Sequence, residues 1–590
     1  MLKLLKELKG KEKLFILLAI ILIVLQVILD LKIPDYMSEI TKLVQTSNTE
    51  INEVLKNGFF MILCSLGSLV LAFSIIFLAS FTGTSFEKSL RRKVFRKVQS
   101  FGMEEINKFS TSSLITRATN DITQIKMFVV MGIQMLAKAP IMATLAIIKI
   151  AGKEWSFSLI TLGGVVIVIV LNLFIILVAI PKFKRIQKLT DDINGITSEN
   201  LHGIKVIRAY NAEEYQLNKF SGTNEDLTKT NMFVQKIMAL IGPVMSSIMA
   251  FQSWAIYFVG AILISNIVGL NRLNIFSDMV VFSAYSVQVI MSFMVLAIIF
   301  VIYPRTAVSI KRVLEVINTE TKIKEGNINS SDTDIKGEIE FKNVSFKYPD
   351  AEDYVLKDIS FKVNTGETVA VIGSTGSGKS TLINLIPRLY DISAGEILID
   401  GINIKEMSNE YLYSKLGYIS QKAVLFKGTI EENIRFGKDN KKVSNEELKE
   451  SLDIAQASSF VGKLDKGIKA NIAQSGTNIS GGQKQRISIA RAIAKKPEIY
   501  IFDDSFSALD YKTDLLLRKE LNKATKDATK MIVASRIGTI KDANLIIVLD
   551  EGNLVGKGTH KELLKNCKVY REIAESQLSK EEIAKCMGTD

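Results

Sequence analysis

The sequence contains very little cysteine and histidine, which narrows the chemistry open to it. The three cysteines, Cys64, Cys567 and Cys586, have neither the spacing of a metal site nor that of a disulfide framework. We therefore expect free thiols facing a reducing cytoplasm. The two histidines are His202 and His560, so few positions in the chain can use an imidazole.

Basic residues outnumber acidic residues. This excess of positive charge first suggests nucleic acid as a partner, but the distribution of the charge along the chain argues against it. The net charge is +13, with 23% charged residues, and a basic chain can bind nucleic acid. Here the basic residues cluster beside long apolar stretches, where Lys and Arg set the orientation of membrane spans. We predict a lipid bilayer as a partner and no nucleic acid.

Six stretches are long and apolar enough to cross a bilayer, which takes about 20 residues. The first is too long for the apolar core of a signal peptide, and no small-residue cleavage site follows it. The predicted spans are Leu14–Leu31, Phe59–Phe81, Phe128–Ala151, Phe157–Pro181, Met238–Ile264 and Phe276–Tyr303.

Basic clusters place the N-terminus and two long connections on the cytoplasmic side. They lie at residues 3–13, 88–97 and 182–188. Both connections have helical spacing, so we expect the spans to continue below the bilayer as helical arms. Transverse turns are predicted at residues 116–126 and 200–210, where they could touch a cytoplasmic domain.

Charges within the predicted spans are few. A charge in hydrocarbon costs at least about 2.5 kcal/mol, so we expect Lys149 and Asp278 to snorkel toward the surface. Lys138 lies deeper, and both a role in a wet cavity and contact with a lipid headgroup remain open for it. Residues 251–258 and 282–294 mix aromatic, Met and amide side chains, which suit either an adaptable binding cavity or helix packing.

After a polar linker the pattern becomes that of a soluble α/β domain. Val369–Ile372 reads as a strand, and Gly373–Ser380 matches G-x-x-x-x-G-K-[ST] before a helix. Backbone N–H groups in such a loop surround phosphate, Lys379 neutralises the β and γ phosphates, and Ser380 binds Mg²⁺. We predict ATP and Mg²⁺ as ligands. The loop residues assigned to ATP are Gly373, Ser374, Thr375, Gly376, Ser377, Gly378, Lys379, Ser380 and Thr381.

Ile479–Gln483, "ISGGQ", resembles the signature motif of the ATP-binding cassette (ABC) family, and the resemblance covers essentially the whole chain. Six spans with long inner arms and one cassette look like a bacterial half-transporter of the multidrug-exporter type. The implied fold is a six-span α-helical domain followed by an α/β P-loop domain. In that family two cassettes enclose two ATP molecules, each between one P-loop and the opposite signature.

The resemblance also implies roles for single residues. Tyr348 would stack on adenine, and Gln421 would reach Mg²⁺ and the attacking water. Asp503 would hold Mg²⁺ through water, and Asp510 would bridge the two halves. The residues that would contact the γ-phosphate of the partner's ATP are Ser480, Gly481, Gly482 and Gln483.

Two positions depart from the family pattern. The residue after the metal-binding Asp503 is normally a glutamate that positions or deprotonates water, and this chain has Asp504. One missing methylene moves the carboxylate back by roughly 1 Å, which can cost about 10²-fold in rate. The family's histidine at the end of a later strand is replaced by Ser535. The catalytic set Asp504, Gln421 and Ser535 is therefore expected to hydrolyse ATP slowly.

A complete signature beside a weakened acid favours a heterodimer. A second half-transporter would supply glutamate and histidine, and its ATP would be hydrolysed against this chain's signature. The expected cargo is amphipathic small molecules or lipids exported across the bacterial cytoplasmic membrane. Two alternatives remain: a homodimeric lipid or drug flippase, and an ATP-sensing regulatory subunit or channel.

The sequence predicts four regions. They are a transmembrane domain at 1–318, a linker at 319–336, a cassette at 337–578 and a C-terminal tail at 579–590.

Overall fold

The computed structural model describes residues 10–45, 51–151, 154–266, 271–330, 335–349, 351–437 and 443–587. The basic residues before position 10, residues 331–334 of the predicted linker and 588–590 of the predicted tail lie outside these ranges. The chain forms two compact units. The membrane unit comprises residues 1–100 and 109–319, and the cassette unit comprises 101–108 and 320–590.

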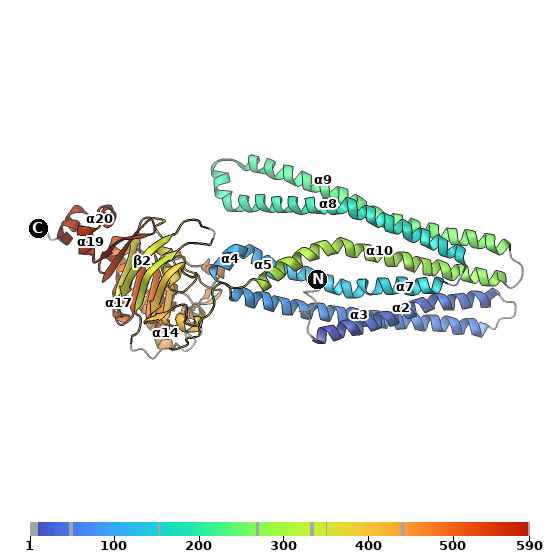
Figure 1. The fold of residues 1–590 in the computed structure, drawn as a ribbon, viewed down its shortest axis with the longest axis horizontal. Helices are drawn as coiled ribbons and strands as arrows, with labels where there is room; N and C mark the ends of the chain where they lie inside the picture. The colour runs from blue at the N-terminus through green and yellow to red at the C-terminus, as the bar shows by residue number, and fades with distance from the viewer. Residues whose placement is uncertain are drawn as a thin grey trace. The chain divides into compact units, whose positions relative to one another are not determined.

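Six helical segments of the described chain are long and apolar enough to cross a membrane, which confirms the predicted spans. Four of them, α3, α8, α9 and α10, are continuous helices far longer than a bilayer is thick. The predicted helical arms are therefore also present. Figure 1 shows the longest two, α8 and α9, running side by side. The five uninterrupted helices are α2 (Gly10–Gln45), α3 (Ile51–Gln99), α8 (Trp155–Ala209), α9 (Glu213–Ser265) and α10 (Asn271–Asn318).

The third span is built from shorter pieces, and here one sequence prediction is wrong. A transverse turn was expected at residues 116–126, but this stretch is helical. The second turn, expected at residues 200–210, is likewise helical up to Ala209, where α8 ends. Asp121 lies buried in the first stretch, accepting a hydrogen bond from Ser309 (2.8 Å) and pairing with Arg312 (3.3 Å). These partners on α10 hold the segment in the helix bundle. The pieces are α5 (Thr111–Thr116), π-helix η1 (Arg117–Asp121), α6 (Ile122–Met131), π-helix η2 (Gly132–Leu136) and α7 (Lys138–Ile150).

The charged residues of the third span are paired with acids that the sequence analysis overlooked. Lys149, 46% exposed, binds Asp35 at 2.7 Å, and Lys138 binds Asp30 at 3.2 Å. Both acids lie on α2. Pairing two opposite charges in the apolar part of the bundle offsets the cost of placing either one there.

The short helix α4 (Met103–Phe109) carries the segment that belongs to the cassette unit. Its buried Glu105 accepts hydrogen bonds from the backbone N–H groups of Gly102 (2.9 Å) and Lys322 (3.0 Å). Asn107 donates to the Tyr390 hydroxyl at 3.1 Å. The segment that reaches the cassette therefore directly follows the second span's arm, a little before the stretch in which the sequence predicted it.

The cassette is built on a ten-stranded sheet, in the order β5-β4-β1-β2-β12-β11-β3-β10-β9-β6. Strands β11, β3, β10, β9 and β6 are mutually parallel. The strands of this sheet are β1 (Ile339–Phe346), β2 (Leu356–Val363), β3 (Thr368–Gly373), β4 (Ala394–Ile399), β5 (Ile402–Asn403), β6 (Leu416–Ile419), β9 (Ile499–Asp503), β10 (Thr529–Val533), β11 (Leu545–Asp550) and β12 (Asn553–Gly558); β7 (Gly428–Thr429) pairs separately with β8 (Asn471–Ile472).

Helices cover the sheet because its central strands are apolar on both faces. Along β3, Val369 and Val371 pack into one core with α11, while Ala370 and Ile372 pack into another with α16 and α17. The helices of the cassette are α11 (Lys379–Leu385), α12 (Asn409–Lys415), α13 (Ile430–Ile434), α14 (Asn445–Ile454), α15 (Ser458–Val461), α16 (Gly481–Lys495), α17 (Tyr511–Ala524), α18 (Ile537–Ile540), α19 (His560–Asn566), α20 (Lys568–Glu575) and α21 (Lys580–Met587), with 3₁₀ turns η4 (Gly467–Lys469) and η5 (Gln474–Gly476).

Candidate functional site

The candidate site lies at the carboxyl edge of the parallel strands. In their register Val371 of β3 pairs with Val533 of β10, which pairs with Asp503 of β9. The segments that follow these strands therefore emerge side by side. They are the phosphate loop after β3, the Ser535 loop after β10, the acid pair at the end of β9 and, after β6, Gln421.

The phosphate loop has the backbone that its glycines allow. Gly376 and Gly378 have φ of +87° and +95°, a region that residues with a Cβ rarely adopt. A Cβ on Gly378 would also lie 2.9 Å from Leu356 Cδ2. The buried Ser377 hydroxyl has no hydrogen-bond partner in the described part of the chain. A loop kept open and a polar group left without a partner both fit a phosphate ligand.

Lys379 is folded onto its own loop. Its ammonium donates to the backbone carbonyls of Gly373 (2.8 Å) and Ser374 (2.6 Å). Burial lowers the pKa of Lys379, and the nearby charge of Asp504 opposes that shift. The ammonium is thus held beside the loop, where an anionic phosphate would stabilise its charged form.

Ser380 and Asp503 are brought together, as the predicted metal site requires. The Ser380 hydroxyl donates to Asp503 Oδ1 at 3.0 Å. Burial raises the pKa of Asp503, the hydrogen bond from Ser380 lowers it, and the adjacent Asp504 raises it. A hydroxyl and a carboxylate are oxygen ligands that suit Mg²⁺, which would supply positive charge to neutralise phosphate oxygens. The residues present therefore fit the ion.

The backbone of Asp504 is held on both sides. Its φ is +44°, its N–H donates to Val533 O at 3.0 Å, and its carbonyl accepts from the Ser507 hydroxyl at 2.8 Å. Its carboxylate interacts electrostatically with both Lys379 and Asp503. The backbone at position 504 is therefore held in place, and the reach of the carboxylate is set by the aspartate side chain itself.

Ser535 occupies an exposed loop that a later part of the chain supports. The Gln577 side chain donates to Ser535 O at 2.9 Å and accepts from Ile537 N–H at 2.8 Å. Gln577 was missed in the sequence analysis, since no local pattern marks a glutamine that bridges a distant loop. Asp550, which accepts from Ser374 at 3.3 Å, was missed too, although an acid at the end of an apolar strand is a visible signal.

The remaining predicted residues lie as follows. The Tyr348 hydroxyl is 3.0 Å from the Thr381 hydroxyl, which brings the aromatic side chain beside the phosphate loop. Gln421 is exposed after β6. Asp510 caps α17, accepting from Thr513 N–H at 3.0 Å, and this hydrogen bonding lowers the pKa of Asp510.

The signature forms the start of α16. Ser480 accepts from Gln483 N–H at 3.4 Å, and the Gln483 side chain accepts from Ser480 N–H at 3.0 Å. This reciprocal capping orders the helix start and leaves Ser480 and Gly481 exposed. A Cβ on Gly482 would lie 3.1 Å from Ala508 O, so the second glycine allows close packing on the loop after Asp504.

Comparisons with known proteins agree with this architecture. Residues 16–293 match the family model described as the ABC transporter transmembrane region, and residues 356–507 match the ABC transporter model. An uncharacterized ABC transporter ATP-binding protein of Mycobacterium tuberculosis is 36% identical over 518 residues, covering 88% of this chain and 87% of that protein. YfiB of Bacillus subtilis, also an uncharacterized ABC transporter ATP-binding protein, is 35% identical over 526 residues, covering 88% and 90%.

A solved structure of a bacterial Atm1-family ABC exporter with ATP bound is similar with a TM-score of 0.77. The match covers 96% of this chain and 100% of that one, at 22% sequence identity. At this identity the likeness concerns the fold.

The two adjacent acids, Asp503 and Asp504, lead to a prediction about how nucleotide affinity depends on pH. Metal-dependent nucleotide binding needs ionised Asp503, whose pKa is raised above 3.8, partly by Asp504. Affinity for ATP with Mg²⁺ should be complete above that raised pKa and fall as the pH drops through it. Asp504→Asn removes one cause of the shift and should move the fall to lower pH.

The measurement is equilibrium binding of a fluorescent ATP analogue with Mg²⁺ between pH 4 and 8. Asp510→Asn, which changes an acid outside the strand edge, serves as the matched control. Identical pH curves for the wild type and Asp504→Asn would contradict this account of the pair.

Proposed function

The chain belongs to the ABC transporter family, and from that premise we propose that it is one half of a heterodimeric ATP-driven exporter. Its membrane unit would translocate amphipathic small molecules or lipids across the cytoplasmic membrane of a bacterium. Its own phosphate loop would bind ATP with Mg²⁺ and hydrolyse it slowly. Its signature would complete the faster site of the partner half-transporter.

One observation carries the proposal: Asp504 is both shorter than the family's glutamate and fixed by its backbone. Its N–H and carbonyl are bonded to Val533 and Ser507, so the missing reach is not recovered. A general base must come within about 2.6–3.2 Å of the proton that it accepts. The site that binds ATP is complete in Lys379, Ser380 and Asp503, and the weakness is confined to hydrolysis.

The second departure acts on the same step. Ser535 follows β10 directly beside the acid pair, and serine lacks an imidazole that could contact the γ-phosphate. By contrast, Ser480 and Gly481 are exposed at an ordered helix start, where the nucleotide of another cassette can reach them. A weak phosphate-loop side and an intact signature side support an asymmetric pair more than a homodimer.

Within such a pair each chain would have a distinct part. ATP held at this chain's phosphate loop would stabilise closure of the cassettes, and ATP at the composite site of the partner would be hydrolysed in each cycle. Closure changes the spans only if ATP binds the closed state more tightly than the open one.

Changing Asp504 and Ser535 to the family's glutamate and histidine tests the proposal that this chain's own ATP site hydrolyses slowly. Asp504→Glu with Ser535→His should raise the ATPase activity of the purified chain, by at least about tenfold given that a misplacement near 1 Å can cost 10²-fold. Activity is measured in nanodiscs with and without the co-purified half-transporter. Adding Lys379→Ala should abolish the gain. Brisk wild-type turnover without any partner, or no gain in the double variant, would overturn the assignment.

The asymmetry predicts unequal effects of two substitutions in the mixed dimer. Gly481→Asp places a carboxylate against the partner's γ-phosphate and should remove most of the ATPase activity, by about 10²-fold or more. Lys379→Ala acts on the slow site and should cost less than tenfold. Equal losses from the two variants, measured at saturating ATP, would favour two equivalent sites and thus the homodimeric alternative.

A further inference from the structure

The membrane unit contains a cavity whose lining says what it can bind. It has a volume of about 410 Å³ and lies among α2, α3, η2, α7 and α10. This size is within the range of small-molecule sites. Of the predicted cavity stretches, residues 282–294 contribute Gln288, Met291 and Ser292 to the lining.

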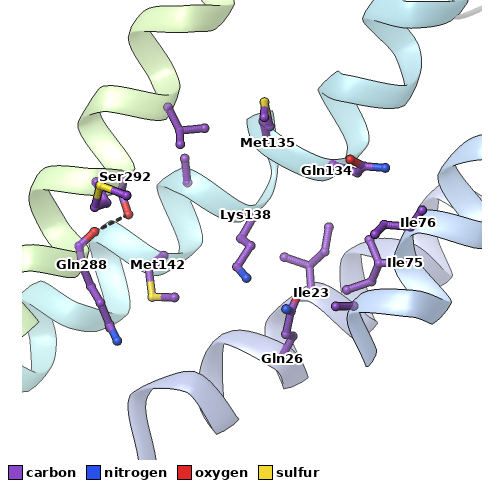
Figure 2. A pocket seen from close by; sticks show the side chains of 14 residues that line it. Ile23, Gln26, Ile75, Ile76, Gln134, Met135, Lys138, Met142, Gln288 and Ser292 are labelled. Atoms are coloured by element: carbon purple, nitrogen blue, oxygen red, sulfur yellow. Dashed lines mark hydrogen bonds between the residues drawn. The ribbon is translucent and has the colours of Figure 1, made fainter. Parts of the chain in front are cut away.

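Lys138 is the single charged side chain among the described residues that line this cavity. Figure 2 shows it extending from its helix toward Ile23 and Gln26. Asp30, which pairs with it at 3.2 Å, is not part of the lining and also accepts a hydrogen bond from Ser68. Within the lining, the cavity therefore meets the ammonium of the pair and not its carboxylate.

Uncharged polar side chains also line the cavity. Gln26, Gln134 and Gln288 contribute three carboxamides to the lining. Gln134 belongs to the π-helix Gly132–Leu136, an irregularity that often occurs at functional sites. Amides and an ammonium together can donate several hydrogen bonds to one oxygen-rich group.

The rest of the lining suits a flexible apolar tail. Met135, Met142 and Met291 line the cavity together with Ile, Ala and Val side chains. Thioether side chains adapt to differently shaped apolar ligands. Opposite charges attract strongly at the low dielectric of such a site, whereas a cationic head group would meet the ammonium first.

We infer that the cavity binds amphipathic anions, with a carboxylate, sulfonate or phosphate head at Lys138 and an apolar tail among the methionines. The inference rests on the proposed export function, because it names the class of its cargo. The site itself is defined by the membrane unit alone, so it is testable without ATP hydrolysis.

The test reads the charge preference of the cavity directly. Met291, whose side chain lines the cavity with 41% exposure, is changed to Cys in a chain with Cys64, Cys567 and Cys586 replaced by Ala. The modification rates by methanethiosulfonate reagents carrying a sulfonate or a quaternary ammonium are compared in nanodiscs, relative to free cysteine. The anionic reagent should be favoured by about fivefold.

Matched variants assign that preference. Lys138→Met should abolish it, Lys138→Arg should retain it, and Asp30→Asn should increase it. A cysteine at the 80% exposed Tyr210 serves as a control that Lys138→Met leaves unchanged. Equal rates for the two reagents, a cationic preference, or indifference to Lys138 would overturn the inference even if ATPase activity behaves as proposed.

A second assay distinguishes two sources of the anionic ligand, free amphipathic molecules and membrane lipids. Dodecyl phosphate, but not dodecyltrimethylammonium, should stimulate the ATPase of the mixed dimer in neutral-lipid nanodiscs if free amphipaths are taken. Stimulation by anionic phospholipid alone would identify a lipid head group, and stimulation by the cationic amphipath would contradict the anionic class.

A separate observation in the cassette concerns Gln577. It lies in the turn between α20 and α21, and its amide bridges the two sides of the Ser535 loop, at Ser535 O and Ile537 N–H. On the strand side, Ala534 N–H donates to Val371 O at 3.2 Å. The loop is thus held by β3 at one end and by Gln577 at the other. The geometry points to Gln577 as a positioning residue for the side chain at position 535.

The test uses the chain in which Asp504→Glu and Ser535→His restore hydrolysis. Gln577→Ala should lower kcat by about three- to tenfold, because the side chain at position 535 is less well positioned for the reaction, with KM for ATP unchanged. Gln577→Glu keeps the acceptor for Ile537 N–H and should retain part of kcat. Ser579→Ala is the control. It removes a cap at the start of α21 and should leave kcat unchanged.

Amide hydrogen exchange gives a readout that does not depend on the weak-site proposal. The Ile537 amide should lose protection in Gln577→Ala and keep it in Gln577→Glu. Unchanged kcat in Gln577→Ala would overturn the positioning role. So would a fall in kcat in the Ser579→Ala control as large as the fall in Gln577→Ala.

Discussion

The register between three parallel strands is the constraint on which the nucleotide site depends. Val371, Val533 and Asp503 are aligned by backbone hydrogen bonds across β3, β10 and β9. That alignment brings the phosphate loop, the Ser535 loop and two carboxylates to one edge, although they are separated by long stretches of sequence. Because the backbone sets these positions, a change in side-chain length, such as Asp504 for glutamate, alters reach without altering placement.

The sequence predicted the architecture well wherever the signal was local. Apolar length identifies each span, and Gly376 and Gly378 identify the phosphate loop, because each signal depends on neighbouring residues alone. The transverse turn at residues 116–126 was wrong because Asp121 finds its partners, Ser309 and Arg312, on a helix nearly two hundred residues later. Likewise, Gln577 acquires its place through long-range contacts that no spacing encodes.

The charges of the membrane unit show the same limit. Lys138 and Lys149 are visible as isolated cations in the third span, and the sequence alone favours the surface for one and leaves the other open. Their partners, Asp30 and Asp35, lie on the first span. Pairing makes these charges compatible with hydrocarbon, and it also orients them: at Lys138 the carboxylate is placed outside the cavity lining and the ammonium within it.

The position of α4 has a consequence for biosynthesis. Its residues sit between two membrane helices in the chain, yet they are packed in the cassette unit. Glu105 and Lys322 are 217 positions apart, and Asn107 and Tyr390 are 283 apart. On a ribosome this segment leaves the exit tunnel long before its binding surface exists. It must wait undocked while four further spans are inserted, so a chaperone or the membrane surface has a defined interval in which to shield it.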